Sequence, residues 1–123
     1  MDGVSDSRQR LGRWGEAQAA EYLEQKGYEI VAFNQRTPYG EIDIIARQEQ
    51  ELVFVEVKTR TSLKYGYPEA AVNLDKQEHL LAAVQAYVQE HPEVAGTWRI
   101  DVIAILRRRG KALEITHFEN ALH

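Results

Sequence analysis

The chain has 123 residues and a formal net charge of −4, and it contains no cysteine. This length predicts a single domain over residues 1–123. The lack of cysteine excludes disulfides, thiolate metal sites and cysteine nucleophiles, and no apolar run approaches the ~18 residues of a membrane span. Because the first residues also lack the apolar segment of a secretory signal, we expect a cytoplasmic protein with no membrane partner.

The first half of the chain predicts one helix and three strands. Residues 1–7 are expected to form a flexible leader. The spacing of apolar residues then predicts a helix over 11–26. Apolar runs rich in β-branched residues predict strands over 28–34, 41–47 and 52–59. A short polar connection joins the last two of these strands, so we expect them to pair as a hairpin.

The second half predicts another helix and two more strands. A loop over 61–73 precedes a helix over 75–91, which Asp75 would cap. Strands follow over 98–106 and 112–118. The order of helix, three strands, helix and two strands indicates an α/β fold. We expect a mixed central sheet of about five strands flanked by helices.

The third predicted strand carries two charges in an otherwise apolar run. Its side chains alternate between the two faces of the sheet. Val53, Val55 and Val57 share one face, and Phe54, Glu56 and Lys58 share the other. A strand this apolar is typical of the centre of a sheet, covered on both faces. Glu56 and Lys58 would therefore lie where an unpaired charge is costly to bury.

The preceding strand adds a second acid near the first. Ile42 and Ile44 are expected to share one face of it, with Asp43 on the other. In a hairpin, Asp43 can lie close to Glu56, and two neighbouring carboxylates repel each other. A divalent cation relieves that repulsion, and Mg²⁺ and Mn²⁺ prefer oxygen ligands. A buried salt bridge network without chemistry is the alternative.

An acid also interrupts the apolar stripe of the first helix. Glu16 falls on the same helical face as Ala19, Ala20 and Leu23. Gly12 and Gly15 would permit the backbone of this helix to approach the sheet closely. Glu16 either joins the two strand acids or reaches solvent from the edge of the stripe.

These residues belong to two recognisable patterns. Asp43, followed by Glu56-Val57-Lys58, resembles the signature of PD-(D/E)XK nucleases. A wider set of segments resembles the YraN-like family of small bacterial proteins. The segments that carry this resemblance are GRWGE (12–16), NQR (34–36), GEID (40–43), FVEVKTR (54–60), KQ (76–77) and RID (99–101).

The resemblance implies a fold and a set of roles. It implies the restriction-endonuclease-like fold, with similarity to archaeal Holliday junction resolvases, which act as dimers. Asp43 and Glu56 would then bind Mg²⁺ or Mn²⁺, Lys58 would assist catalysis, and Glu16 would complete the site. Gln77 matches a glutamine that often stands on the helix after the core motif of that fold.

The leading hypothesis is therefore a metal-dependent endonuclease that hydrolyses phosphodiester bonds in DNA, branched or junction DNA included, as a homodimer. Arg36, Arg60 and Lys64 are candidates for phosphate contacts, which position nucleic acid without reading its sequence. Gln77 would contact the substrate or orient a residue that does.

Two aromatic residues lie in the loop that follows the third strand. Tyr65 and Tyr67 flank Gly66. Such residues either stack on unpaired bases or pack within their own loop, and loop packing is the expectation here.

A binding function without catalysis is the alternative to the nuclease hypothesis. The same fold could bind nucleic acid or a protein partner without cutting. The net charge of −4 favours this alternative weakly, because few basic residues are available to hold a duplex. The charges on Asp43, Glu56 and Lys58 oppose it, because a binding module has no need of a costly charged cluster.

Overall fold

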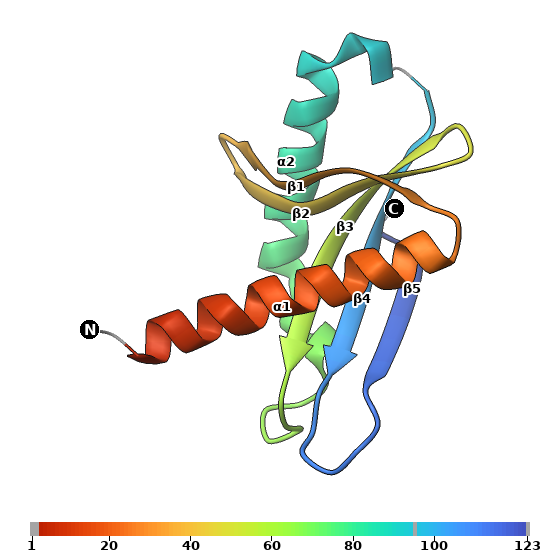
Figure 1. The fold of residues 1–123 in the computed structure, drawn as a ribbon. Coiled ribbons are helices and arrows are strands. Elements are labelled where there is room, and N and C mark those ends of the chain that lie inside the picture. Colours follow the sequence, from red (N-terminus) through yellow and green to blue (C-terminus); the bar gives the residue numbers. More distant parts are fainter. Residues whose placement is uncertain (1–2, 95, 123) are drawn as a thin grey trace.

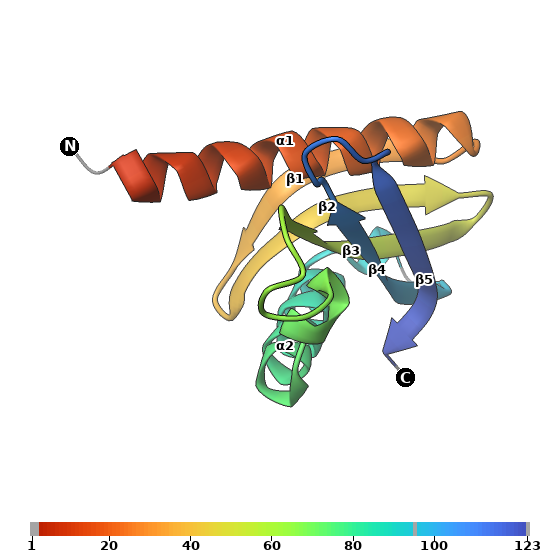
Figure 2. The same cartoon turned by 90° about the horizontal axis from the view of Figure 1, so that it is seen from below.

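A five-stranded sheet lies between two long helices in the computed structural model (Figure 1). The structure describes residues 3–94 and 96–122, with the backbone alone for residues 3–5. Seen from below, helix α1 (Gly3–Gln25) crosses one face of the sheet and helix α2 (Leu74–Glu90) covers the other (Figure 2). The predicted α/β class is confirmed, and the arrangement is consistent with a restriction-endonuclease-like fold.

The strands lie in the sheet in the order in which they occur in the chain. They are β1 (Glu29–Thr37), β2 (Gly40–Gln48), β3 (Glu51–Arg60), β4 (Trp98–Leu106) and β5 (Glu114–Leu122). The pair β3–β4 is parallel and the other three pairs are antiparallel. Parallel neighbours require a crossover connection. This crossover consists of a loop, the short helix η1 (Pro68–Ala71), α2 and the short helix η2 (Pro92–Val94).

Helix α1 begins earlier than the sequence pattern predicts. It starts at Gly3, so residues 3–7 are helical and the expected flexible leader is wrong for them. Residues 1–2 lie outside the described part of the chain. Once the packed part of a helix has formed, each further turn adds hydrogen bonds without a new nucleation cost. The polar first turns therefore extend beyond the sheet (Figures 1 and 2).

The cap of α2 also differs from the prediction. Asn73, rather than Asp75, occupies the cap position, and its Oδ1 accepts a hydrogen bond from the N–H of Lys76 (3.0 Å). The helix therefore begins at Leu74, one residue before the predicted start.

The core forms two layers, one on each face of the sheet. Beneath α1, it contains Ala19, Ala20, Leu23, Ile44, Ala46, Val53, Val55, Val57, Ile103 and Ile105. Beneath α2, it contains Leu80, Ala83, Val84, Ile42, Ile45, Leu52, Phe54 and Ile100. The predicted alternation in β3 is confirmed. The expectation that Ile42 and Ile44 share a face is wrong, because the alternation in β2 shifts by one position at Asp43.

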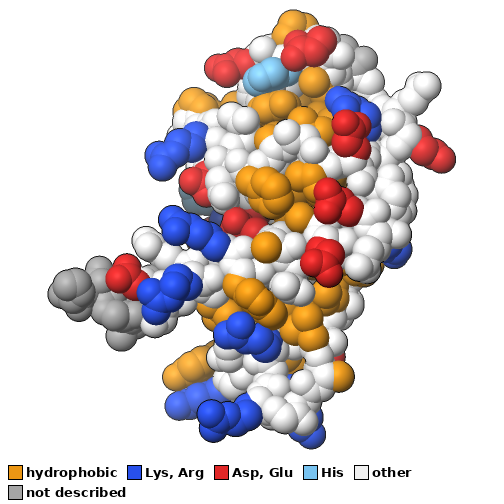
Figure 3. Space-filling view, viewed as in Figure 1, with side chains coloured by type: hydrophobic (Ala, Val, Ile, Leu, Met, Phe, Trp, Pro, Cys, Tyr) orange, Lys and Arg blue, Asp and Glu red, His pale blue; other side chains and the backbone are white. Residues whose placement is uncertain are grey.

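Charge is unevenly distributed over the surface. In the view of Figure 3, most Lys and Arg side chains lie on the lower part of the molecule, and most Asp and Glu side chains lie higher. Exposed basic residues occur on the first turns of α1, at Arg8, Arg10 and Arg13, and after β4, at Arg107 and Arg109. In the ranges 3–94 and 96–122, no helix has the length and apolar character needed to cross a membrane.

Candidate functional site

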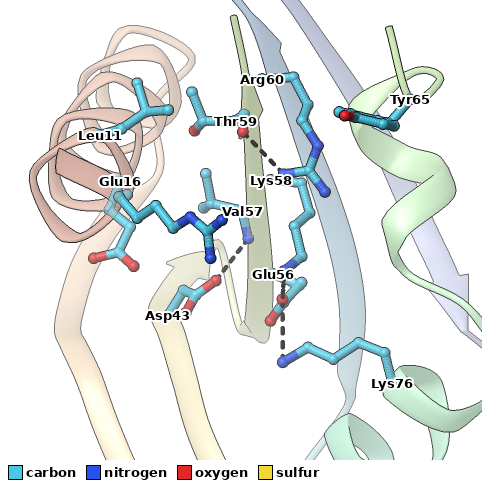
Figure 4. Close-up of a pocket in the computed structure, with 12 residues that line it drawn as sticks. Leu11, Glu16, Asp43, Glu56, Val57, Lys58, Thr59, Arg60, Tyr65 and Lys76 are labelled. Carbon is cyan, nitrogen blue, oxygen red and sulfur yellow. Dashed lines mark hydrogen bonds and ion pairs between the residues drawn. The ribbon is translucent and has the colours of Figure 1, made fainter. Parts of the chain in front are cut away.

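A cavity of about 690 Å³ lies between α1, the carboxyl end of β3 and the start of α2 (Figure 4). It collects side chains from four elements and a loop. The lining residues are Arg8, Leu11, Gly12, Glu16, Asp43, Glu56, Val57, Lys58, Thr59, Arg60, Tyr65 and Lys76. All four residues predicted to form the reactive centre, Glu16, Asp43, Glu56 and Lys58, are thus brought to one cavity.

Asp43 and Glu56 meet where β2 and β3 separate. The pairing of these strands ends at Ile44 and Val55. Beyond that point, Asp43 Oδ2 accepts the hydrogen bond of the Val57 N–H (2.8 Å), in place of a strand carbonyl. The shift in β2 therefore turns the Asp43 side chain toward β3. This contact fixes one carboxylate beside the strand that carries the other.

Glu56 is a buried acid with an unsatisfied oxygen. Its side chain is 2% exposed, and its Oε1 has no hydrogen bond partner within the described part of the chain. Burial, and then the charge of Asp43, raise the pKa of Glu56 to about 7. Burial also raises the pKa of Asp43, although the Val57 N–H acts in the opposite direction. The pair therefore favours a bound proton or a cation between the two acids.

Two lysines approach the other oxygen of Glu56. Lys58 Nζ lies 3.8 Å and Lys76 Nζ 3.5 Å from Glu56 Oε2 (Figure 4). Lys58 comes from β3 and Lys76 from the first turn of α2, so the acid stands between cations from two elements. Both ammonium groups remain partly exposed, at 27% and 39% of their side chains. They can therefore reach a ligand in the cavity as well as Glu56.

Glu16 lies on the α1 side of the cavity, held by an asparagine. Asn34 Nδ2 donates to Glu16 Oε1 (3.1 Å) and to Glu41 Oε1 (3.3 Å). Asn34 adopts the left-handed backbone region, with φ at 50°, within strand β1. Burial, followed by the charge of Asp43, raises the pKa of Glu16. Glu16 is thus hydrogen-bonded to Asn34 and lies close enough to Asp43 for the two negative charges to repel each other.

Gly15 allows α1 to lie this close to the sheet. A Cβ atom at Gly15 would overlap the Thr59 Oγ1 of β3, whereas one at Gly12 would meet nothing within 4 Å. The expected close approach is confirmed for Gly15 and wrong for Gly12. Glu16 reaches the cavity because the residue before it has no side chain.

Only some of the residues predicted to contact nucleic acid lie at the cavity. Arg60 lines the cavity. Arg36 is an exposed residue of β1 that pairs with Glu41 (4.0 Å), and Lys64 lies over the ring of Tyr65; neither lines the cavity. Gln77 points away from it, because its Nε2 donates to the Val72 carbonyl (2.9 Å) and its side chain lines other cavities.

Lys76 and Asn34 belong to this site although neither is among the predicted functional residues. The family resemblance points to Gln77 in place of Lys76, and it gives Asn34 no role of its own. Lys76 lies in the first turn of α2 whether Asn73 or Asp75 caps the helix, so the position of the cap does not distinguish it from Gln77. No local signal indicated the contact of Asn34 with Glu16, which depends on the position of α1.

The donor set fits a hydrated divalent cation better than an all-protein metal cage. Among the described residues, no three side chains of His, Cys, Asp or Glu come together as a metal site. Mg²⁺ retains several waters and commonly uses one or two carboxylates. Asp43 and Glu56 supply two, and the orphaned Oε1 of Glu56 is an acceptor that a cation would satisfy.

Comparison with known proteins places this chain in a family. A family model described as "Uncharacterised protein family UPF0102" matches residues 15–105, which contain every acid and lysine of the cavity. A UPF0102 protein of Syntrophotalea carbinolica is 49% identical over 114 residues, covering 93% of this chain and 92% of the relative. One of Caldicellulosiruptor saccharolyticus is 40% identical over 116 residues, covering 94% and 98%. The YraN-like resemblance is thereby confirmed, and this chain belongs to the UPF0102 family.

Proposed function

We propose that this protein is a metal-dependent nuclease that hydrolyses phosphodiester bonds in DNA in the cytoplasm. The observation that carries the proposal is the buried Glu56, which lies beside Asp43 with one oxygen unsatisfied at the bottom of a cavity that two lysines enter. Such a group is expensive to bury without a function. Phosphodiester hydrolysis uses a divalent cation, a water nucleophile and cationic groups around the phosphate.

Asp43 and Glu56 would hold Mg²⁺ or Mn²⁺. When bound, the ion would acidify water and stabilise negative charge on the phosphate. The chain's own residues would do the rest. Lys58 would donate to a phosphate oxygen or hold the attacking water, and Lys76 would offer a second ammonium from the opposite wall. Glu16, held by Asn34, would orient water on the α1 side.

Arg60 and Arg8 would contact phosphates on either side of the reacting one, since both line the cavity. Cutting both strands of a duplex or a junction requires two such sites, which supports a homodimer as the form acting on those substrates. Sedimentation of the protein with and without DNA tests that part of the proposal.

The test of the nuclease itself is a cleavage assay with the purified full chain in Mg²⁺ and in Mn²⁺. The substrates are single-stranded, duplex, flapped and four-way-junction DNA, with matched RNA. Asp43→Ala and Glu56→Ala run beside wild type. Asp75→Asn is the matched control, because Asp75 is an exposed acid next to Lys76 that does not line the cavity.

Cleavage by wild type and the control, lost in both cavity variants, is the expected result. Cleavage that survives Asp43→Ala and Glu56→Ala would contradict the proposal, because it would come from another site or a contaminant. If a folded wild type binds DNA and Mn²⁺ but cuts nothing, the non-catalytic binding module is the better description. That alternative is favoured by the net charge of −4, which leaves few basic residues to hold a duplex.

A further inference from the structure

The loop between β3 and η1 presents an aromatic ring to the reactive cavity. Tyr65 is 83% exposed, yet it lines the same cavity as Glu56 and Lys58. The expectation that this tyrosine packs within its loop is wrong. An aromatic side chain so exposed gains little from the fold. At the mouth of a charged cavity, this ring is available to a ligand from outside the chain.

Backbone contacts hold the loop that carries this ring. Its start is tied to the sheet, because the Arg107 N–H donates to the Arg60 carbonyl (2.9 Å). A turn follows in which the Gly66 N–H donates to the Leu63 carbonyl (3.1 Å), with the φ of Gly66 at 100°. The buried Pro68 anchors the other end. These contacts hold the backbone of the loop at Tyr65, and with it the direction in which the side chain leaves the chain.

The surroundings of the ring match a nucleotide. The Lys64 Nζ lies 5.5 Å from the Tyr65 ring centroid, and Arg60 lines the cavity beside it. Figure 4 shows Tyr65 on the opposite side of the cavity from Leu11. A flat π-surface with cations beside it suits a base, with the cations available for its phosphates.

Pairing state decides which nucleotides can use such a surface. In a duplex, the faces of the bases are covered by their neighbours and only the edges are open to a protein. Stacking on a side chain therefore requires an unpaired base. We propose that Tyr65 is a stacking platform for an unpaired nucleotide next to the reacting phosphate, so that the substrate class is single-stranded DNA or an unpaired strand at a branch. This inference rests on the proposed phosphodiester chemistry of the Asp43–Glu56 site.

The test measures binding without metal, so that it does not depend on cleavage. The anisotropy of a short fluorescein-labelled oligothymidylate is titrated with wild type, Tyr65→Ala, Tyr65→Trp and Tyr67→Ala in EDTA. Tyr67 is the matched control, because it is 58% exposed in the same loop but lines a different cavity. The same strand in a duplex and as matched RNA completes the set, and thermal unfolding verifies that each variant is folded.

Tyr65→Ala is expected to weaken single-strand binding about 10-fold or more, with Tyr65→Trp restoring it and Tyr67→Ala matching wild type. Duplex binding should be the same in all four proteins. The inference would be overturned if Tyr65→Ala bound the single strand as well as wild type does, or if it lost affinity for the duplex to the same extent. It would also be overturned if wild type did not bind the single strand. Tighter Tyr65-dependent binding of the RNA would overturn the assignment to DNA.

The two proposals can fail separately. If wild type cuts DNA through Asp43 and Glu56 but Tyr65→Ala cuts and binds single strands equally well, the stacking platform is wrong and the nuclease stands. If nothing is cut but single-strand binding depends on Tyr65, the stacking platform stands on a protein that binds without cutting.

Discussion

Glu56 is the residue whose local environment is least favourable to its own charge. Its pKa of about 7 shows that two lysine neighbours do not compensate for burial and for the nearby Asp43. Both ammonium groups are partly hydrated and lie 3.8 and 3.5 Å from the acid. These distances exceed the roughly 2.9 Å of a short charge-assisted hydrogen bond. The fold therefore holds Glu56 in place at some expense of stability.

Glu56→Gln is accordingly expected to stabilise the metal-free protein. The amide keeps the shape of the side chain and removes the buried charge, which should raise the free energy of unfolding by about 1–3 kcal/mol at pH 8 in EDTA. Urea unfolding of both proteins measures the difference. Mg²⁺ should stabilise wild type more than the variant. A variant less stable than wild type in EDTA would mean that the lysine pairs outweigh burial.

Lys58→Ala tests whether the proposed chemistry can be lost while metal binding is retained. Lys58→Ala removes an ammonium group that would meet the phosphate but leaves both carboxylates in place. We expect turnover to fall by roughly 10²-fold or more, with the affinity for Mn²⁺ within a few-fold of wild type. Titration calorimetry and a cleavage time course measure the two quantities. Lys111→Ala is the control, because Lys111 is exposed and does not line the cavity.

At the scale of elements, the site depends on the contact of α1 with β3. This contact is close because Gly15 faces the Thr59 side chain. It places Glu16 near Asn34 of β1, although the two residues are 18 positions apart in the chain. The helix therefore supplies one wall of the cavity and the acid on that wall.

Gly15→Ala tests this contact. The added methyl group would overlap Thr59 Oγ1, so α1 must shift, and we expect a loss of about 1–3 kcal/mol in the free energy of unfolding. Gly12→Ala provides the comparison on the same helix. It meets nothing within 4 Å, and it should be neutral or stabilising, since alanine is the better helix former. Equal effects of the two substitutions in urea unfolding would show that the contact is not tight.

At the scale of the whole molecule, a buried network at the other end of the sheet joins elements distant in sequence. Asp101 is 0% exposed, so it is paired in the core and not solvent-facing. It accepts hydrogen bonds from Arg99 (3.0 Å), His117 (2.7 Å) and the Asn120 N–H (2.8 Å). Arg99 also donates to Glu51 (2.6 Å), at the start of β3. This network is structural and lies outside the reactive cavity.

Asp101→Asn is expected to lower the free energy of unfolding by about 3 kcal/mol at pH 7, because Arg99 would lose its buried partner. Burial acts to raise the pKa of Asp101, but the bonds from His117, Arg99 and Asn120 outweigh it and hold the pKa below its ordinary value of 3.8. The stabilisation is therefore complete above pH 3.8 and is lost as the pH falls through the lower folded value.

Urea unfolding of both proteins across the acidic range checks this sign. The difference between wild type and Asp101→Asn should be constant above about pH 5 and shrink below about pH 4. A difference that grows on acidification would contradict the assignment of Asp101 as an ionised core residue.

Much of the fold could be predicted from local patterns. The range of β4 was predicted without error, and the faces of Val55 and Phe54 follow from strand alternation alone. The first turns of α1 could not be predicted, because their helicity depends on extension from the packed part of the helix. Strand alternation alone also could not predict that Ile42 and Ile44 lie on opposite faces of the sheet. The shift at Asp43 depends on its contact with Val57 of the next strand.

The chemical groups of the site are evident from local patterns: the two acids that interrupt apolar strands, the lysine beside one of them, and the acid on the apolar stripe of the first helix. Burial of an unpaired charge is costly wherever it occurs, so a charged residue in an apolar run can be recognised from the sequence. The choice of Lys76 over Gln77 depends on tertiary packing. Adjacent helical residues point about 100° apart, and which of them meets Glu56 depends on how α2 packs on the sheet.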